Sequence, residues 1–201
     1  MPVMRFRLSL FLVAAMSAPA SQAERMGGPI VDLDYQYYTV YGSSTLEIQK
    51  SISAQSPLKT RAEFFAGKTD WTVRSEYHLV ALASGGCRVE GPKVYVTIKI
   101  HIPRLRVSTS QSKAVQQEWS RYFAALQSHE LQHAQTGVKA GGELLRRLNG
   151  AESQLDCQQA GPAIDKATKA LIERLGMADA KLDRETQHGN LTGAVLDLTV
   201  R

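Results

Sequence analysis

The absence of proline between Pro103 and Pro162 leaves room for one long helix, and this feature constrains the fold more than any other. Within the stretch, side chains that suit a packed interface recur every three or four residues. An α-helix has 3.6 residues per turn, so these positions share one face. The face consists of Val115, Trp119, Tyr122, Leu126, His129, His133, Gly137, Ala140 and Leu144.

A second helix is predicted from about Pro162, because proline is favoured in the first turn of a helix. We expect Gly189 to cap its C-terminal end, where a left-handed residue is common. The apolar stripe predicted for this helix consists of Ile164, Ala167, Leu171, Leu175, Ala178 and Leu182.

Residues 30–103 show the period-two hydropathy pattern of β-strands instead. Strands are predicted at residues 34–41, 71–79 and 94–102, and Ser44 with Glu47 forms a capping box that predicts a short helix to about residue 53. Strands in one half and helices in the other indicate an α+β fold. We expect an antiparallel sheet in the N-terminal half, packed against the long helices of the C-terminal half.

The first 23 residues have the order of features found in a secretory signal peptide. Arg5 and Arg7 precede a short apolar run at residues 8–16, and Ser21-Gln22-Ala23 offers small residues before a cleavage site at Glu24. The alternative is a buried N-terminal helix. We expect residues 24–201 to form a single secreted domain, periplasmic in a Gram-negative host.

Charge and hydropathy limit the kinds of partner that we expect. The chain holds 24 Lys and Arg against 19 Asp and Glu, a formal net charge of +5. No basic cluster interleaves with aromatic residues, so no nucleic-acid partner is expected. No apolar run reaches 18 residues, so no transmembrane segment is expected after signal cleavage.

Cys87 and Cys157 are the only cysteines, so one intramolecular pairing is possible. An oxidising compartment would favour a disulfide between them, and the alternative is two buried free thiols. The Cys-x-x-Cys spacing of redox motifs is absent.

The segment from His129 to His133 reads H-E-x-x-H and falls inside the first predicted helix, as in a zincin-like metalloprotease helix. Residues four apart lie on one helix face, so both imidazoles can ligate one Zn²⁺. Glu130 occupies the adjacent sector, where its carboxylate can act as general base. The alternative is a pair of ordinary histidines on a packed face.

A catalytic zinc site usually has three protein ligands, so a third is needed. His188 is our prediction, because it is the one histidine of the helical half beyond the motif and precedes a glycine. It could instead be a last-turn residue that complements the helix dipole. Carboxylates left open as third ligands are Glu152, Asp156, Glu173, Asp179 and Asp183.

Taken together, these segments resemble the bacterial family called domain of unknown function 922, described as predicted secreted Zn-dependent proteases. The similarity runs through residues 37–42, 69–74 and 102–104, the motif helix, Cys157 and residues 183–189. The last segment matches a D-x-x-T-x-H-G signature, which implies that His188 is a zinc ligand. Asp183 and Thr186 are then expected to orient the ligand side chains without binding the ion themselves.

The sequence therefore predicts a secreted zinc metallohydrolase with one Zn²⁺ per chain, held by His129, His133 and His188. Its substrate would be a peptide or protein, and Glu130 would serve as general base. One alternative is a non-catalytic binding or structural module of the periplasm. Another is an interaction domain stapled by the disulfide, without a metal.

Overall fold

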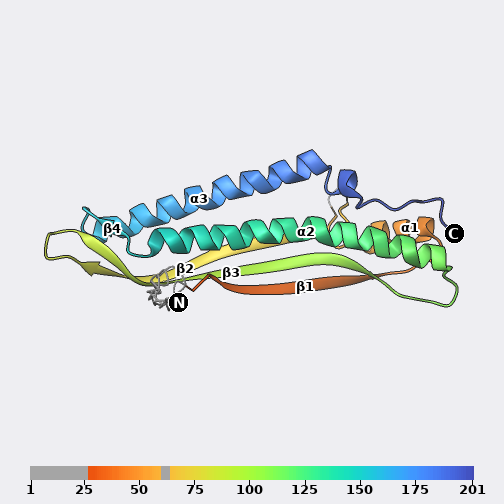
Figure 1. The fold of residues 1–201 in the computed structure, drawn as a ribbon, viewed down its shortest axis with the longest axis horizontal. Coiled ribbons are helices and arrows are strands. Elements are labelled where there is room, and N and C mark those ends of the chain that lie inside the picture. Colours follow the sequence, from red (N-terminus) through yellow and green to blue (C-terminus); the bar gives the residue numbers. More distant parts are fainter. Residues whose placement is uncertain (1–26, 60–63) are drawn as a thin grey trace, which may run out of the picture.

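The computed structural model describes residues 27–59 and 64–201, so the predicted signal peptide lies outside the described residues. A sheet forms one layer, helix α2 lies along it, and helix α3 runs along α2 on the side away from the sheet (Figure 1). The elements are β1 (Ile30–Val40), α1 (Thr45–Gln55), β2 (Lys68–Ala81), β3 (Cys87–Leu105), α2 (Lys113–Leu148), β4 (Glu152–Ser153), α3 (Cys157–Thr186) and the 3-10 helix η2 (Asn190–Thr192).

The α+β class is confirmed, but the sheet is mixed, so the prediction of an antiparallel sheet was wrong. Strand β3 lies in the centre, antiparallel to β2 and parallel to β1, and β4 pairs antiparallel with its first residues. A short turn joins β2 to β3, which forces those two strands to be antiparallel. β1 lies at the opposite edge of the sheet, and α1 connects it to β2. A period-two pattern is the same for either strand direction, so the sequence does not indicate that β1 runs parallel to β3.

The main core lies between the sheet and α2. The inward side chains of β3, from Val94 to Ile102, are at most 1% exposed. On α2 the predicted face is buried except for the half-buried Trp119. Gly137 lets the two layers meet closely, because a Cβ atom there would lie 2.9 Å from the Trp71 side chain. The predicted helix face and the predicted strand face are both confirmed.

Helix α3 begins earlier than predicted and packs more lightly than α2. Asp156 is its N-cap and accepts a hydrogen bond from the Gln159 amide at 2.9 Å, so Pro162 lies inside the helix. Of the predicted stripe, Leu171 and Leu175 are buried, whereas Ala167 and Ala178 are exposed. The helix lies over α2 and β2 with most of its outer side in solvent.

The end of α3 is a left-handed turn. The C-cap is Gln187, two residues before the predicted Gly189, and φ is 51° at Gln187, 53° at His188 and 84° at Gly189. Non-glycine residues rarely adopt positive φ, so this turn carries a backbone cost at two positions. It reverses the chain directly beside α2.

The chain after η2 forms an extended C-terminal strap, residues 194–201, along α1 and α2 (Figure 1). The hydroxyl of the fully buried Thr45 donates to the carbonyl oxygens of Asp197 at 2.6 Å and Val200 at 2.9 Å. The Arg121 guanidinium donates to the Val195 carbonyl at 2.5 Å. Side chains of both helices thus fix a segment that has no regular secondary structure.

A disulfide joins Cys87 at the start of β3 to Cys157 at the start of α3, which confirms the predicted pairing. The bond fastens the lightly packed helix to the sheet at one end. Among the helices of residues 27–59 and 64–201, none combines the length and the apolar character needed to cross a membrane.

Replacing both cysteines with alanine should lower the free energy of unfolding by about 4 kcal/mol, because the bond closes a loop of 70 residues in the unfolded chain. Urea denaturation of the double variant and the wild type would measure the difference. Reduced wild-type protein is the matched control and should unfold at the same urea concentration as the variant. Equal midpoints for the oxidised wild type and the variant would contradict the prediction.

Candidate metal centre

Two histidine side chains of α2 converge on one point. His129 and His133 lie one helical turn apart and are 2% and 6% exposed. Their Nε2 atoms are 3.3 Å apart, with the two rings nearly perpendicular. Both imidazoles thus present the same ring nitrogen to one small volume, as the motif predicts.

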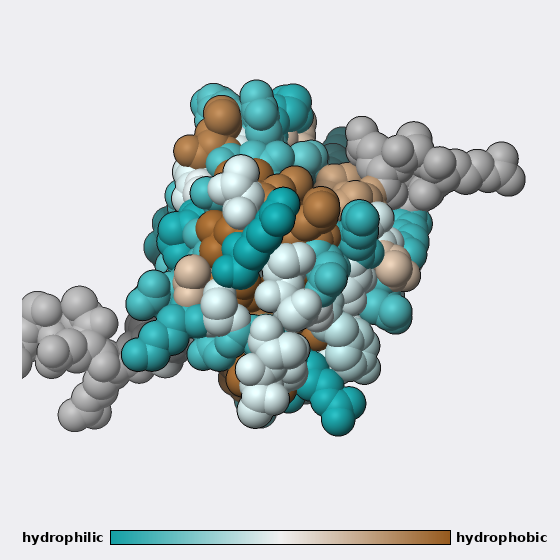
Figure 2. All heavy atoms as spheres, turned by 90° about the vertical axis from the view of Figure 1, so that its right-hand side faces the viewer, coloured by the Kyte–Doolittle hydropathy of each residue, from teal (hydrophilic) through white to brown (hydrophobic). Residues whose placement is uncertain are grey.

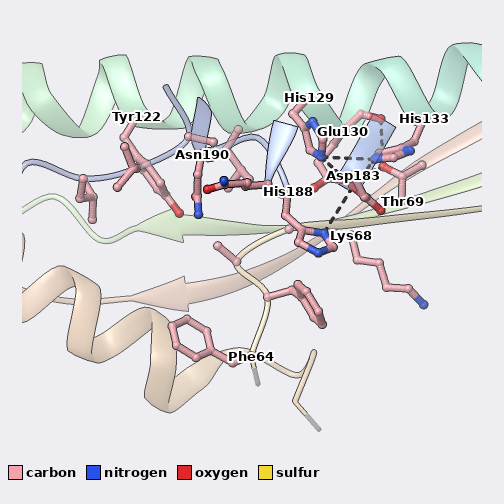
Figure 3. Close-up of a pocket in the computed structure, with 18 of the residues that line it drawn as sticks. Phe64, Lys68, Thr69, Tyr122, His129, Glu130, His133, Asp183, His188 and Asn190 are labelled. Carbon is pink, nitrogen blue, oxygen red and sulfur yellow. Dashed lines mark hydrogen bonds and ion pairs between the residues drawn. The ribbon is translucent and has the colours of Figure 1, made fainter. Parts of the chain in front are cut away.

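Asp183, in the last turn of α3, completes the group. Its Oδ1 atom lies 3.1 Å from His129 Nε2 and 3.0 Å from His133 Nε2, as the dashed lines of Figure 3 show. The three donor atoms form a nearly equilateral triangle. They make a largely buried His-His-Asp group that could bind a metal ion.

The distances between the three donor atoms suit an ion with tetrahedral coordination. Metal–ligand distances of about 2.0–2.1 Å in a regular tetrahedron give distances of about 3.3–3.4 Å between ligand atoms. The three observed separations, 3.0 to 3.3 Å, are slightly shorter. Two neutral imidazoles and one carboxylate are also a donor set that Zn²⁺ accepts. The residues therefore fit such an ion.

Asp179, one turn before Asp183 on α3, contacts the His133 ring at Nδ1, on the side away from the His-His-Asp group. Its Oδ1 lies at ion-pair distance from His133 Nδ1, 3.2 Å, and its Oδ2 accepts a hydrogen bond from the Trp71 indole N–H. Burial alone would lower the pKa of His133, but the contact with Asp179 and the charge of Asp183 outweigh it, so that pKa is raised. A carboxylate in this position orients a metal-binding imidazole.

His129 has a different environment. Burial and the neighbouring His133 lower its pKa, and Asp183 only partly opposes them. Its Nδ1 atom is buried and has no hydrogen-bond partner among the described residues. A Cβ atom on Gly189 would lie 3.0 Å from the imidazole Cγ. The ring is therefore held by packing against the left-handed turn, where only glycine leaves enough room.

Glu130 points from α2 towards the start of β2. Its side chain is buried, and its Oε2 accepts a hydrogen bond from the Thr69 hydroxyl at 2.8 Å. A Cβ atom on Gly67, directly before β2, would lie 2.6 Å from Oε1, so the chain can approach the carboxylate only with glycine there. Burial raises the pKa of Glu130 to about 7, although the Thr69 hydrogen bond acts against it. Such a carboxyl can take up or release a proton near neutral pH.

His188 and Thr186, both named from the sequence, lie beside the triangle. The His188 side chain is 54% exposed, its Nδ1 is 3.4 Å from Asp183 Oδ1, and its ring packs against Phe65. The Thr186 hydroxyl donates to the Leu182 carbonyl at 2.8 Å and accepts from the Gly189 amide at 3.1 Å, which ties the turn to the helix. The structure thus groups Asp183 with the two motif histidines, and ligation by His188 stays a prediction.

The group opens into a pocket of about 750 Å³ (Figure 3). The end of the pocket at the His-His-Asp group, called the metal end below, contains His129, Glu130, His133, Asp179 and Asp183. Beside it lie Lys68 and Thr69 of β2, His188 of the turn and Asn190 of η2. The other lining residues are Gln49, Phe64, Phe65, Ala66, Gly67, Tyr122, Leu126, Gln187, Ala194, Val195, Leu196 and Leu198.

Sequence reasoning missed the contributions of β2. Thr69 and Trp71 of β2, and Gly67 directly before it, lie far from the motif in the chain. Residues 69–74 carry part of the family resemblance, but their local pattern assigns them no role at the site. Asp179 and Asp183 were among the open carboxylates. Their spacing of four residues, which matches that of the two histidines, is the signal that could have selected them.

Comparison with known proteins gives one match. The family described as "Bacterial protein of unknown function (DUF922)" matches residues 35–189, which include the sheet except for the start of β1, the motif helix and the whole of α3. Neither the curated proteins nor the solved structures gave a match. The match covers most of the chain and every member of the His-His-Asp group, and this protein therefore belongs to the DUF922 family.

Proposed function

We propose that this protein is a secreted zinc-dependent hydrolase of peptide bonds, with the ion held by His129, His133 and Asp183. The observation that carries the proposal is the convergence of these three donor atoms, 3.0–3.3 Å apart, next to a buried glutamate in a pocket. A purely structural zinc site is usually closed by four protein ligands, whereas catalytic sites keep one position free.

The donor set favours zinc among the common divalent metals. Calcium and magnesium prefer oxygen ligands, and only one of the three donors here is an oxygen. Imidazole nitrogens suit zinc well, and the separations match a tetrahedral site. The disulfide is consistent with an exported protein, since oxidising compartments are where such bonds persist.

When bound, zinc in such a site polarises a carbonyl group and eases the deprotonation of water. Glu130 accepts that proton on its carboxylate and later donates it to the amine nitrogen that leaves. The Thr69 hydroxyl holds Oε2 of this carboxylate in one orientation. Asp179 keeps His133 in the tautomer whose Nε2 lone pair faces the centre.

The zinc content of the mature protein, residues 24–201, tests the ligand set. We expect about one zinc per chain by mass spectrometry in the wild type, and loss of the metal in His133→Ala and Asp183→Ala, because a catalytic site uses three protein ligands. His188→Ala is the matched control and should keep its zinc. Loss of zinc from His188→Ala with retention in Asp183→Ala would make His188 the third ligand instead.

Glu130→Gln tests catalysis separately from metal binding. The variant should keep its zinc and its fold but lose hydrolysis by about 10²- to 10⁴-fold, because glutamine cannot accept the proton from water. Cleavage of a mixed peptide library, followed by mass spectrometry, measures this. A zinc-loaded wild type that cleaves no peptide would contradict the proposed hydrolase activity and favour a non-catalytic binding module.

Asp179→Asn tests the contact behind His133. The amide carries no charge to hold the imidazole, so zinc affinity should fall by about 10- to 100-fold in a chelator competition. Glu173→Gln, an exposed position on the same helix, removes the same charge without touching the centre and should leave the affinity unchanged. Equal affinities for the two variants would show that Asp179 does not position His133.

A further inference from the structure

The pocket continues beyond the metal end as an apolar chamber. Its floor is α2, where Leu126 and Tyr122 lie on the same helix face as the two histidines. Leu126 precedes His129 by three residues, about 4.5 Å along the helix axis, and Tyr122 by seven, about 10 Å. An apolar surface therefore begins within one helical turn, about 5.4 Å, of the two histidines.

Two further segments close the chamber. Phe64 and Phe65 come from the chain before β2, and Ala194, Val195, Leu196 and Leu198 come from the C-terminal strap. Every charged side chain of the pocket's described lining belongs to the metal end or to Lys68. Viewed from the end where the strap lies, Figure 2 shows brown apolar side chains gathered among teal polar ones.

The chamber is preformed. Thr45 and Arg121 hold the strap through its backbone carbonyl groups, as described above, and the Asp197 amide donates to Glu118 at 2.8 Å. These bonds use the strap's polar groups and leave its apolar side chains to line the cavity. Ala194 and Leu196 are buried, while Val195 and Leu198 are 53% and 46% exposed at the mouth.

We propose that this chamber, formed by Phe64, Phe65, Tyr122, Leu126, Val195, Leu196 and Leu198, selects substrates with a large apolar side chain next to the hydrolysed bond. The inference rests on the proposed function of the metal end. An apolar side chain that enters the chamber moves from water to an apolar surface, which is favourable. An acidic side chain would lose its hydration without gaining a cationic partner there.

Cleavage of an unbiased peptide library by the zinc-loaded wild type tests this preference. Leucine, isoleucine, methionine or phenylalanine should flank the cleaved bonds on one side, with kcat/KM about 10- to 200-fold above matched aspartate peptides. Cleavage without preference, or next to charged residues, would overturn the assignment of the chamber while leaving the hydrolase intact.

A pair of charge substitutions locates the preference. Val195→Asp and Leu198→Asp place a carboxylate at the mouth of the chamber and should reduce kcat/KM for the leucine peptide at least tenfold. Both positions are exposed, so the variants should fold. Leu191→Asp adds the same charge at a 66% exposed position of η2 outside the pocket lining and should leave the rate unchanged. Equal effects of all three would overturn the proposal.

A binding measurement separates this inference from the proposed function. Two succinyl hydroxamates, one with an isobutyl and one with a carboxymethyl side chain, offer the metal the same ligand and differ only in what enters the chamber. Zinc-loaded Glu130→Gln should bind the isobutyl compound at least tenfold more tightly in calorimetry, even if no peptide is cleaved. Equal affinities would overturn the chamber while leaving any measured peptidase activity in place.

Discussion

The centre depends on the register between two helices. His129 and His133 on α2 face Asp179 and Asp183 on α3, and each pair is spaced by one turn. A shift of either helix by one residue along its axis, about 1.5 Å, would break the contacts of Asp179 and Asp183 with the two histidines. The disulfide at the start of α3 and the left-handed turn at its end fix that register from both sides. The sheet contributes by supporting α2 from below and by supplying Trp71 to Asp179.

Burying so many titratable groups in one place is costly unless they satisfy each other. Each carboxylate here has at least one polar neighbour: Asp183 lies between the two imidazoles, Asp179 accepts a hydrogen bond from Trp71, and Glu130 accepts one from Thr69. The Oδ1 atom of Asp179 makes no hydrogen bond among the described residues and meets His133 only at ion-pair distance. The pKa of Asp179 is lowered. Burial acts to raise this pKa, but the contacts with His133 and Trp71 outweigh the effect of burial. Glu130 shows the opposite balance, since a single hydroxyl does not offset its burial. The two acids are therefore suited to different tasks, one to hold a charge and one to exchange a proton.

Much of the fold could be predicted from periodicity, because local hydropathy determines which face of an element is buried. The face of α2, the alternation of β3 and the capping box at Ser44 are examples. Strand direction could not be predicted, since β1 has the same pattern whether it runs parallel or antiparallel to β3. At the site, His129, His133 and Glu130 are carried by one local motif. The contributions of Asp183, Asp179 and Thr69 depend on how distant segments pack, which one sequence does not show.

The uneven packing of α3 has a consequence for local stability. Its N-terminal end is covalently attached, and its last buried apolar residue is Leu175. Beyond that point the helix is attached mainly by polar groups, Asp179 and Asp183, which face the histidines. An ion that binds both helices adds its binding free energy to this attachment. We therefore expect amide hydrogen exchange in the last turns of α3 to slow as the site fills, while exchange near Cys157 stays constant.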